Sequence, residues 1–532
     1  MARRMAQRQE PIHAVHGHVS SSELCKGRDL SIHGEGHASG SPSALALDST
    51  PLRRGWLVWV LGSLTAASHP PMRREDLAST LRGGWTEKRM AQGGGRRSKN
   101  ASKAAQLRLK RTRAEGPREP ARRALKVAGL FAGIGGIELG FQRSGHHSIL
   151  LCELDRGARA VLHERFPNVD DHDDVCSLRA LPAETEVLAA GFPCQDLSQA
   201  GMTAGIAGSR SGLVAEVFRL LRRRRVPWVV LENVPFMLQL GAGRALEVIV
   251  AGLEGLGYRW AYRVVDSLAF GLPQRRERVF LVACVDDDPR TVLFADDVGE
   301  PEARRPSRDL AFGFYWTEGT RGLGAAVDAV PTLKGGSTIG IPSPPAVLLP
   351  SGVVVTPRIE DAERMQGFEA GWTHPAERVG RRSHRWKLVG NAVTVSVAEW
   401  IGKRLASPGS YDDFLDAHVS HGTRWPYAAW NMGNGRFAAS VSTWPVRRTR
   451  PRLDEFLVDP KPLSTKATAG FWSRLQASSL RRPKWFDAGI VKHLRRMERL
   501  DRRPRERGRL ASVIDDAPSA SERKGGEVAA SG

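Results

Sequence analysis

The sequence predicts an α/β fold built on a largely parallel β-sheet with crossover helices. From residue 125, short apolar runs alternate with segments of helical periodicity, as expected for such a sheet. The first run leads into a glycine-rich turn, where sheets of this class bring the backbone close to a ligand. The expected strands are Leu125–Phe131, Ile149–Cys152, Val187–Ala190 and Trp228–Leu231, and Leu213, Val217, Leu220 and Leu221 recur at helical spacing.

Shifts in composition divide the 532 residues into segments. Residues 123–285 form the sheet domain, a Pro- and Gly-rich stretch at 286–352 reads as a small inserted domain, and 353–405 returns to the sheet domain with helical patterns at Ile359–Met365 and Val393–Leu405. Residues 406–502 carry many arginines and five of the fourteen tryptophans, and form an accessory region of unknown role. The tails, 1–122 and 503–532, are expected to be disordered, and whether 1–122 is translated stays open.

The basic character of the chain comes from its two ends. The formal net charge is +22, yet residues 127–445 hold 34 basic and 36 acidic side chains. A basic chain favours a polyanionic partner, and contacts of the near-neutral body depend on local groups such as Arg275–Arg278 and Arg381–Lys387. The run Arg222–Arg225 could bind phosphate or be the solvated end of a helix.

Cysteine usage and hydropathy indicate the compartment. The five cysteines are odd in number and contain no C-x-x-C pair, which supports neither a disulfide framework nor a zinc site. A reducing, cytoplasmic location fits best. The apolar stretch Trp56–Leu64 is far shorter than the roughly 18 residues that a membrane helix needs, so no membrane partner is expected.

The glycine-rich turn is Phe131-Ala132-Gly133-Ile134-Gly135-Gly136. The dinucleotide fingerprint G-x-G-x-x-G would require glycine where this chain has Glu138, which weakens a nicotinamide or flavin interpretation. Glu153, at the end of the second run, is placed where an acid accepts bonds from ribose hydroxyls. A nucleoside ligand without a diphosphate fits both observations, although a structural tight turn explains the glycines equally well.

A thiol and a carboxyl follow two further strands. Cys194 lies in Gly191-Phe192-Pro193-Cys194-Gln195, directly after the third run, and Glu232-Asn233-Val234 ends the fourth. A cysteine that serves as a small buried hydrophobe would be expected inside the strand. Because the carboxyl ends of parallel strands meet at one edge of a sheet, both groups are expected beside the nucleoside pocket.

These segments, in this order, resemble the DNA (cytosine-5) methyltransferase family. The match continues with Gln274–Arg278, Met365–Phe368 and Gly390–Val393, and it covers about 125–405. The resemblance implies a Rossmann-like, S-adenosylmethionine-dependent methyltransferase sheet domain with a small inserted target-recognition domain at 286–352 and extra terminal segments.

The resemblance also implies the chemistry. The Cys194 thiolate would add to cytosine carbon 6, so that carbon 5 can accept the methyl group. Glu232 would bond the ring nitrogen 3 and the exocyclic amine, Arg278 would contact the ring oxygen, and Arg276 would organise the site. The target base would be flipped out of double-stranded DNA of a specific sequence. The protein would act as a monomer, in restriction-modification beside a separate endonuclease or as an orphan enzyme.

Binding residues are carried over from the same motifs, and no metal is implied. The residues expected to bind S-adenosylmethionine are Phe131, Gly133, Gly135, Glu153, Asp174, Val175, Pro193, Asn391 and Ala392. Those expected to contact DNA are Ser198, Arg210, Thr332 and Lys334, although an ordinary surface loop remains the alternative for Arg210.

Two departures from the family pattern and two competing functions stay open. Gly129 stands where the family usually has aspartate, which puts a supporting bond near the cofactor in doubt, and Pro357-Arg358 is displaced from its usual spacing. The alternatives are methylation of RNA cytosine, against which the intact Pro193-Cys194-Gln195 argues, and a catalytically silent DNA-binding protein, against which the complete catalytic set argues.

Overall fold

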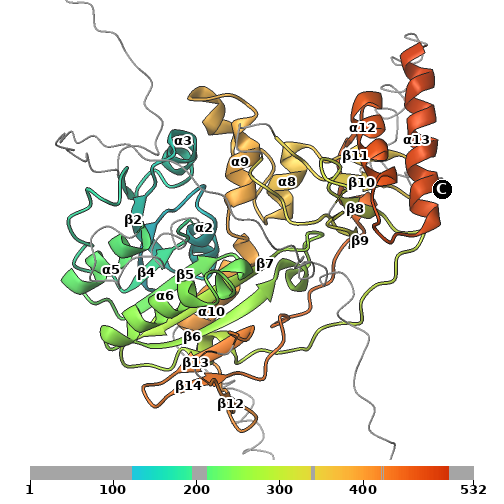
Figure 1. The fold of residues 1–532 in the computed structure, drawn as a ribbon. Coiled ribbons are helices and arrows are strands. Elements are labelled where there is room, and N and C mark those ends of the chain that lie inside the picture. Colours follow the sequence, from blue (N-terminus) through green and yellow to red (C-terminus); the bar gives the residue numbers. More distant parts are fainter. Residues whose placement is uncertain are drawn as a thin grey trace, which may run out of the picture. The chain divides into compact units, whose positions relative to one another are not determined.

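The protein is built around a large mixed β-sheet and a smaller antiparallel sheet (Figure 1). The computed structural model describes residues 123–193, 212–320, 322–336, 342–420, 422 and 424–502. The tails expected to be disordered therefore lie outside the described residues. In the described ranges, no helix combines the length and the apolar character needed to cross a membrane.

Within the described residues the large sheet has the strand order β12-β14-β13-β6-β7-β5-β4-β1-β2-β3. Strands β1 to β5 run parallel, whereas β7 is antiparallel to β5 and β6, and β13 is antiparallel to β6. The strands are β1 (Lys126–Leu130), β2 (His147–Cys152), β3 (Asp170–His172), β4 (Val187–Ala190), β5 (Trp228–Asn233), β6 (Arg259–Asp266), β7 (Glu277–Cys284), β12 (Ala417–His418), β13 (Ala428–Asn431) and β14 (Arg436–Ala438).

The structure confirms the α/β fold and the expected strands. Each of the four apolar runs coincides with a parallel strand, and the predicted ends differ from the observed ones by at most two residues. Strands β4 and β5 are buried along their whole length, because helices cover both faces of the sheet. Continuous apolar runs are the sequence signature of such doubly covered strands.

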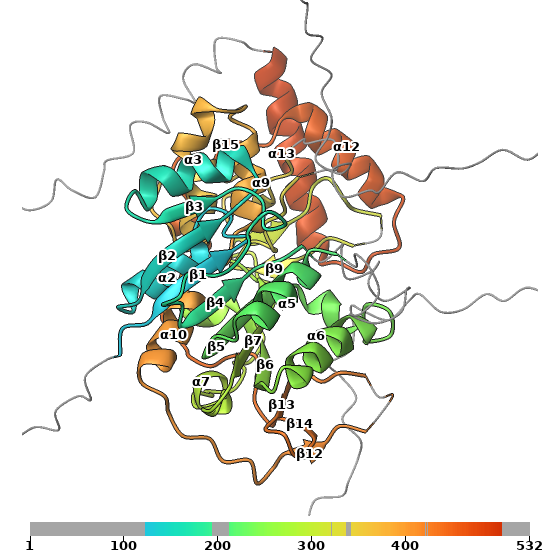
Figure 2. The ribbon, with the colours of Figure 1, turned by 90° about the vertical axis from the view of Figure 1, so that its left-hand side faces the viewer.

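Helices form a layer on each face of the large sheet (Figure 2). Helices α2 (Gly136–Arg143), α7 (Arg290–Leu293) and α10 (Val395–Ala406) share one apolar core with the sheet. Helices α5 (Val214–Arg223) and α6 (Arg244–Gly255) share the core of the opposite face. The helix expected from Leu213 to Leu221 is therefore confirmed. The remaining elements near this sheet are α3 (Arg156–Arg165), α8 (Ile359–Met365), α9 (His384–Asn391), η1 (Pro235–Leu238), η2 (Ser267–Phe270) and η3 (His374–Arg378).

The smaller sheet has the order β15-β11-β10-β8-β9 and is packed against two C-terminal helices (Figure 1). Its strands are antiparallel and short. The elements are β8 (Phe312–Phe314), β9 (Ala326–Val327), β10 (Ala346–Leu348), β11 (Val354–Thr356), β15 (Lys461–Pro462), α11 (Leu453–Phe456), α12 (Thr465–Gln476) and α13 (Lys484–Arg502).

The Trp- and Arg-rich segment 406–502 is divided between the two sheets. Strands β12, β13 and β14 extend the large sheet beyond β6, while β15, α12 and α13 complete the smaller one. The smaller sheet thus combines strands from residues 312–356 with elements that follow in the chain more than a hundred residues later. The boundaries expected at 286, 353 and 406 stay predictions.

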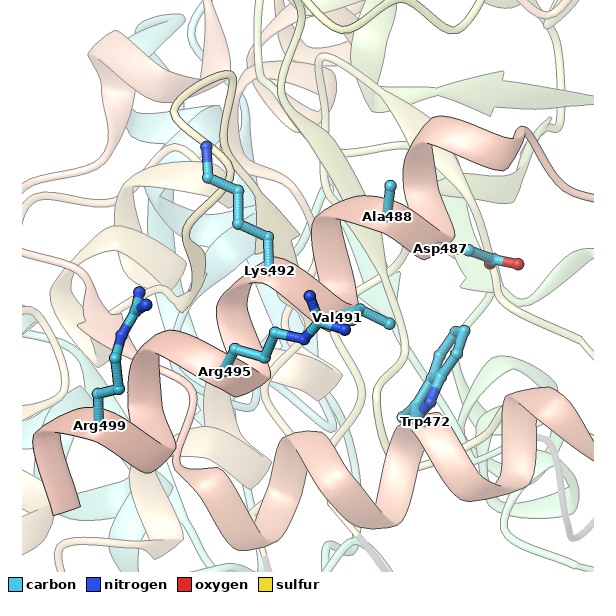
Figure 3. Close-up of a pocket in the computed structure, with 7 residues that line it drawn as sticks. All are labelled: Trp472, Asp487, Ala488, Val491, Lys492, Arg495 and Arg499. Carbon is cyan, nitrogen blue, oxygen red and sulfur yellow. The ribbon is translucent and has the colours of Figure 1, made fainter. Parts of the chain in front are cut away.

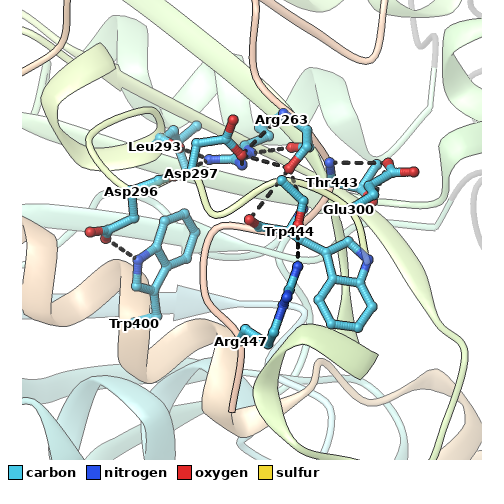
Figure 4. A network of polar contacts seen from close by, with 11 residues as sticks. Arg263, Leu293, Asp296, Asp297, Glu300, Trp400, Thr443, Trp444 and Arg447 are labelled. Atoms are coloured by element: carbon cyan, nitrogen blue, oxygen red, sulfur yellow. Dashed lines mark hydrogen bonds and ion pairs between the residues drawn. The ribbon is translucent and has the colours of Figure 1, made fainter. Parts of the chain in front are cut away.

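A buried arginine on β6 connects the first half of the segment 406–502 to the large sheet through hydrogen bonds (Figure 4). Arg263 on β6 is fully buried, and its Nε donates to the Ser442 carbonyl oxygen at 2.7 Å. Its other nitrogens donate to the carbonyl oxygens of Leu293 and Asp296 and to Asp297 Oδ1, at 2.7 to 2.9 Å. Burying a guanidinium carries a large desolvation cost, which these four hydrogen bonds offset and which the loss of a partner would leave uncompensated.

Candidate active site

The turn after β1 has the left-handed backbone that a ligand-binding loop requires. Phe131, Gly133 and Gly135 have φ angles of 54°, 58° and 83°. A non-glycine residue in this region costs of order 1–3 kcal/mol and occurs mainly at functional sites. A Cβ atom on Gly133 would meet nothing within 4 Å, so this side of the loop is open to a ligand. These three of the residues expected to bind the cofactor therefore lie on one turn, which is open at Gly133.

Glu153 connects this turn to the loop after β2. Its Oε2 accepts from the Gly133 amide at 2.8 Å, and its Oε1 accepts from the Asp155 amide at 2.8 Å. Burial raises the pKa of Glu153, and the two amide donors partly oppose that shift. Each carboxylate oxygen keeps a further lone pair that can accept from a hydroxyl group. This donor and acceptor arrangement fits the ribose of a nucleoside ligand.

Asp174 and Val175, both expected to bind the cofactor, differ in how exposed their side chains are. Asp174 lies on the turn after β3, where its Oδ1 accepts from the Cys176 amide at 2.9 Å, and it is partly exposed. The Val175 side chain is buried in the core of the sheet. Leu154, directly after Glu153, is 55% exposed and was not expected from the sequence. Its signal is an apolar residue next to the candidate ribose acid, where it can form an apolar wall for a base.

The segment after α9 closes over the glycine turn. A Cβ atom on Gly136 would collide with the Val393 carbonyl oxygen, so the two backbones approach as closely as glycine allows. Ala392 is buried beside this contact, and Asn391, the last residue of α9, is exposed. The structure therefore brings the predicted closing residues to the predicted cofactor turn.

A carboxyl and a guanidinium meet at the ends of β5 and β7. Arg278 Nε lies 3.1 Å from Glu232 Oε1, and both side chains are largely buried. Burial raises the pKa of Glu232, while the charges of Arg278 and Arg276 oppose the rise. Burial lowers the pKa of Arg278, and Glu232 opposes that change. A buried carboxyl of this kind is suited to holding a proton and donating it to a base.

Arg276 forms hydrogen bonds both with the segment around the end of α9 and with the inserted region 286–352. Its Nη2 donates to the Ala392 and Gly390 carbonyl oxygens at 2.7 and 3.2 Å, and its Nη1 donates to the Leu333 carbonyl oxygen at 3.3 Å. The side chain is fully buried, and its Nε has no hydrogen-bond partner among the described residues. Burial lowers the pKa of Arg276, with the neighbouring Arg278 charge as the next cause. These contacts suit Arg276 to a positioning role.

The stretch that leads to the candidate nucleophile begins against Glu232. A Cβ atom on Gly191 would lie 3.5 Å from Glu232 Oε2, and Asn233 Nδ2 donates to the Phe192 carbonyl oxygen at 3.0 Å. Pro193 is exposed. Asn233 was not expected as a positioning residue, although its place in Glu232-Asn233-Val234 was a usable signal. The expected residues Cys194, Ser198 and Arg210 lie outside the described part of the chain.

The two remaining DNA candidates lie in the inserted region. Thr332 Oγ1 donates to the Arg275 carbonyl oxygen at 2.9 Å, so its hydroxyl fixes the chain beside the arginine motif. Lys334 is exposed, forms an ion pair with Glu318, and its Nζ lies 3.7 Å from the centroid of the Tyr315 ring. Their contacts with DNA stay predictions.

The carboxyl group of Glu138, on α2, lies beside Gly129. A Cβ atom on Gly129 would collide with the carboxyl group of Glu138, which therefore occupies the space of a larger residue on β1. Glu138 is 1% exposed, and its Oε2 has no hydrogen-bond partner in the described ranges. Burial raises the pKa of Glu138 to about 7. The displaced Arg358, by contrast, pairs with Asp459 of the C-terminal segment.

No cluster of three or more His, Cys, Asp or Glu side chains among the described residues is arranged to hold a metal ion. This edge of the sheet therefore combines the open turn after β1, the Glu153 carboxyl beside it, and the buried Glu232 carboxyl with Arg276 and Arg278.

Comparisons with known proteins show the family to which the chain belongs. The family described as C-5 cytosine-specific DNA methylase matches residues 125–311. The Type II methyltransferase M2.BsuMI of Bacillus subtilis strain 168 is 48% identical over 364 residues, which cover 66% of this chain and 93% of the relative. The Type II methyltransferase M.DsaV of Dactylococcopsis salina is 27% identical over 317 residues, 54% of this chain and 87% of the relative. The solved structure of S. pombe Dnmt2 methyltransferase aligns with a TM-score of 0.38 and 14% identity, over 53% of this chain and 98% of that one.

The chain belongs to the C-5 cytosine-specific DNA methylase family. It is a DNA (cytosine-5)-methyltransferase, as the ordered motifs of the sequence predict. Membership of this family implies S-adenosylmethionine as the methyl donor, and the open turn with Glu153 fits that ligand.

Proposed function

We propose that the protein methylates carbon 5 of cytosine in a specific double-stranded DNA sequence, through a covalent Cys194 adduct on a base flipped out of the helix. The observation that carries the proposal is the buried pair of Glu232 and Arg278, 3.1 Å apart, beside the start of the Cys194 segment. The cofactor turn closes against Val393, next to residues that Arg276 holds. The start of the Cys194 segment, the acid and the candidate methyl-donor turn thus lie at one edge of the sheet.

Phe131, Gly133, Gly135 and Glu153 would hold the cofactor, with Asp174, Val175, Pro193, Asn391 and Ala392 around it. When bound, S-adenosylmethionine supplies the methyl group. The Glu153 carboxylate, tied to the Gly133 amide, would accept from the ribose hydroxyls, and the open side of the Gly133 turn leaves room for the methionine end.

The protein side chains activate the base. Carbon 5 of cytosine is a weak nucleophile, so the Cys194 thiolate first adds to carbon 6. Glu232 in its protonated form donates to ring nitrogen 3, which stabilises the adduct as it forms, and Arg278 contacts the ring oxygen. After methyl transfer, a base removes the proton from carbon 5, and the carbon 6 to sulfur bond breaks. The raised pKa of Glu232 supports its role as the proton donor.

Base flipping is proposed because the enzyme cannot reach the reacting carbons of a cytosine that stays in the duplex. The reacting carbons of cytosine are stacked inside a duplex, and enzymes that modify a base take it out of the stack. Ser198 and Arg210 would stabilise the opened DNA, and Thr332 and Lys334 would act in target recognition by the region 286–352. Base-edge contacts in the major groove would select the sequence.

The biological setting is proposed from the relatives, which are named Type II methyltransferases. The protein would protect DNA in the cytoplasm as the modification enzyme of a restriction-modification system, as a monomer beside a separately acting endonuclease.

Expression in a methylation-free host, followed by bisulfite sequencing of the host genome, tests the proposal and reads the target sequence. We expect 5-methylcytosine at one defined DNA sequence with wild-type protein and none with Cys194→Ser. Wild-type protein should form a covalent complex with duplex DNA that contains 5-fluorocytosine, and Cys194→Ser should not. An unmethylated genome in the presence of folded protein would contradict the proposal, and preferential labelling of RNA would replace DNA as the substrate.

A further inference from the structure

A shallow groove of about 480 Å³ lies between α12 and α13. Figure 3 shows Trp472 of α12 facing α13, and Lys492, Arg495 and Arg499 on α13. The three cationic residues are exposed. Asp487, an acidic residue that also lines the groove, is paired with Arg482, whose Nε lies 2.6 Å from its Oδ1. The charge offered to a ligand by these lining residues is therefore positive.

The cationic residues form a stripe along one face of the helix. Lys492, Arg495 and Arg499 are separated by three and four positions, the spacings that place side chains one above another. Like charges at these spacings destabilise a helix, and a polyanion would relieve that repulsion. The stripe is about 10 Å long from Lys492 to Arg499. Over that length, one strand of B-DNA presents roughly three phosphates.

The opposite face of α13 is fixed to the smaller sheet. Phe486 and Ile490 are fully buried in the core that includes Phe312 of β8. His493 is also buried, with Nδ1 accepting from the Val354 amide at 3.2 Å and Nε2 donating to the Leu463 carbonyl oxygen at 2.9 Å. The helix cannot turn its cationic face inward without breaking this packing, so the stripe has a fixed orientation relative to the sheet.

We propose that the groove between α12 and α13 binds the phosphate backbone of duplex DNA outside the methylated base. The inference rests on the proposed function, which supplies the DNA. Glu232 belongs to the large sheet, whereas the stripe is fixed to the smaller one, so each sheet contacts its own part of the substrate. Backbone contacts of this kind orient a protein on the duplex and add affinity without reading sequence.

The test uses the full chain with Lys492→Gln, Arg495→Gln and Arg499→Gln combined. Binding to a fluorescent duplex of arbitrary sequence is measured at several salt concentrations, because each phosphate contact contributes about 0.9 to the slope of log K against log salt. We expect the slope to fall by about two to three in magnitude, and the apparent KM for target DNA to rise. A charge-conserving variant, Arg495→Lys with Arg499→Lys, should keep the wild-type slope.

The matched control removes three exposed arginines, by Arg222→Gln and Arg223→Gln at the end of α5 and by Arg179→Gln at the loop residue whose carbonyl oxygen accepts from Arg223. We expect a slope close to that of wild type. Thermal unfolding of every variant checks that the fold is retained. A wild-type slope in the groove variant, or an equal fall in the control, would overturn the proposal. Because binding to arbitrary DNA is measured separately from methyl transfer, an inactive wild type that still shows the difference in slope contradicts only the proposed function.

Discussion

Arg278 and Glu232 form a buried pair, with Nε of the arginine 3.1 Å from Oε1 of the glutamate. The arginine comes from β7 and the glutamate from β5, neighbouring antiparallel strands of the large sheet. Burial raises the pKa of Glu232, and the arginine charge limits that rise. The pair therefore controls how long the carboxyl keeps its proton as the pH increases.

Glu232→Gln should lower kcat by roughly 10²–10⁴-fold, because the amide cannot transfer a proton to the base. In the wild type, kcat should fall as the pH rises through the pKa of Glu232. Arg278→Ala should move that fall to higher pH, since it removes a charge that lowers this pKa. Single-turnover methyl transfer across a pH series measures both effects.

The control for this prediction is Glu399→Gln on α10, where the glutamate pairs with Lys403 at the surface. Its kcat should stay within about twofold of wild type, because exposed pairs contribute little. Wild-type kcat in Glu232→Gln would show that the carboxyl has no part in the chemistry.

Glu138 makes the stability of the fold depend on pH. Its pKa is raised to about 7 by burial, so the folded state holds a proton that the unfolded chain releases near pH 4.5. The stabilising effect of that proton is complete below pH 4.5 and is lost as the pH rises through 7. The loss amounts to about 3 kcal/mol at most. In Glu138→Gln this fall in the free energy of unfolding should disappear.

Urea unfolding of both proteins between pH 5 and about 8 measures the difference. If the free energy of unfolding changed with pH in the same way in wild type and Glu138→Gln, this carboxyl would not titrate between those limits. Gly129→Ala, which places a methyl group against the same carboxyl, should destabilise the protein at every pH.

Gly136→Ala should weaken cofactor binding. The added Cβ would collide with the Val393 carbonyl oxygen, so the closing segment or the glycine turn must move. Overpacking of this kind costs about 1–3 kcal/mol, which corresponds to roughly five- to 150-fold in affinity. Calorimetric titration with S-adenosylmethionine gives the affinity directly.

The control is Gly255→Ala at the end of α6, where a Cβ atom would meet nothing within 4 Å. Its cofactor affinity should equal that of wild type, and its stability should change by at most about 1 kcal/mol. Unchanged affinity in Gly136→Ala would mean that the contact with Val393 does not support the site.

Arg263→Ala should destabilise the protein by about 3 kcal/mol, because it removes the ion pair with Asp297 and the donor to three carbonyl oxygens. Arg259→Ala lies on the same strand but removes exposed bonds to the Asp286 and Asp287 carbonyl oxygens, and it should cost less than about 1 kcal/mol. Urea midpoints compare the two variants. Equal losses would contradict a special role for the buried network.

The sequence was informative wherever a residue's environment depends on its own strand. Strands β4 and β5 were predicted from continuous apolar runs, because helices bury both of their faces. Glu153 and Glu232 were predicted as site residues because the carboxyl ends of parallel strands meet at one edge. Their placement beside the glycine turn and Arg278, respectively, agrees with that reasoning.

Contacts between distant segments were decided only by the tertiary structure. Strand β13 pairs with β6 through backbone hydrogen bonds, which leave no side-chain pattern across the roughly 160 residues between them. Glu138 fills the space beside Gly129 because α2 packs on β1, and neither residue alone reveals this. Arg276 donates to the carbonyl oxygens of Leu333, Gly390 and Ala392, groups that every residue carries. The sequence by itself thus determined the parallel strands and the family and predicted the reacting groups, while packing decided which segments support them, since backbone pairing and shape complementarity are properties of two surfaces together.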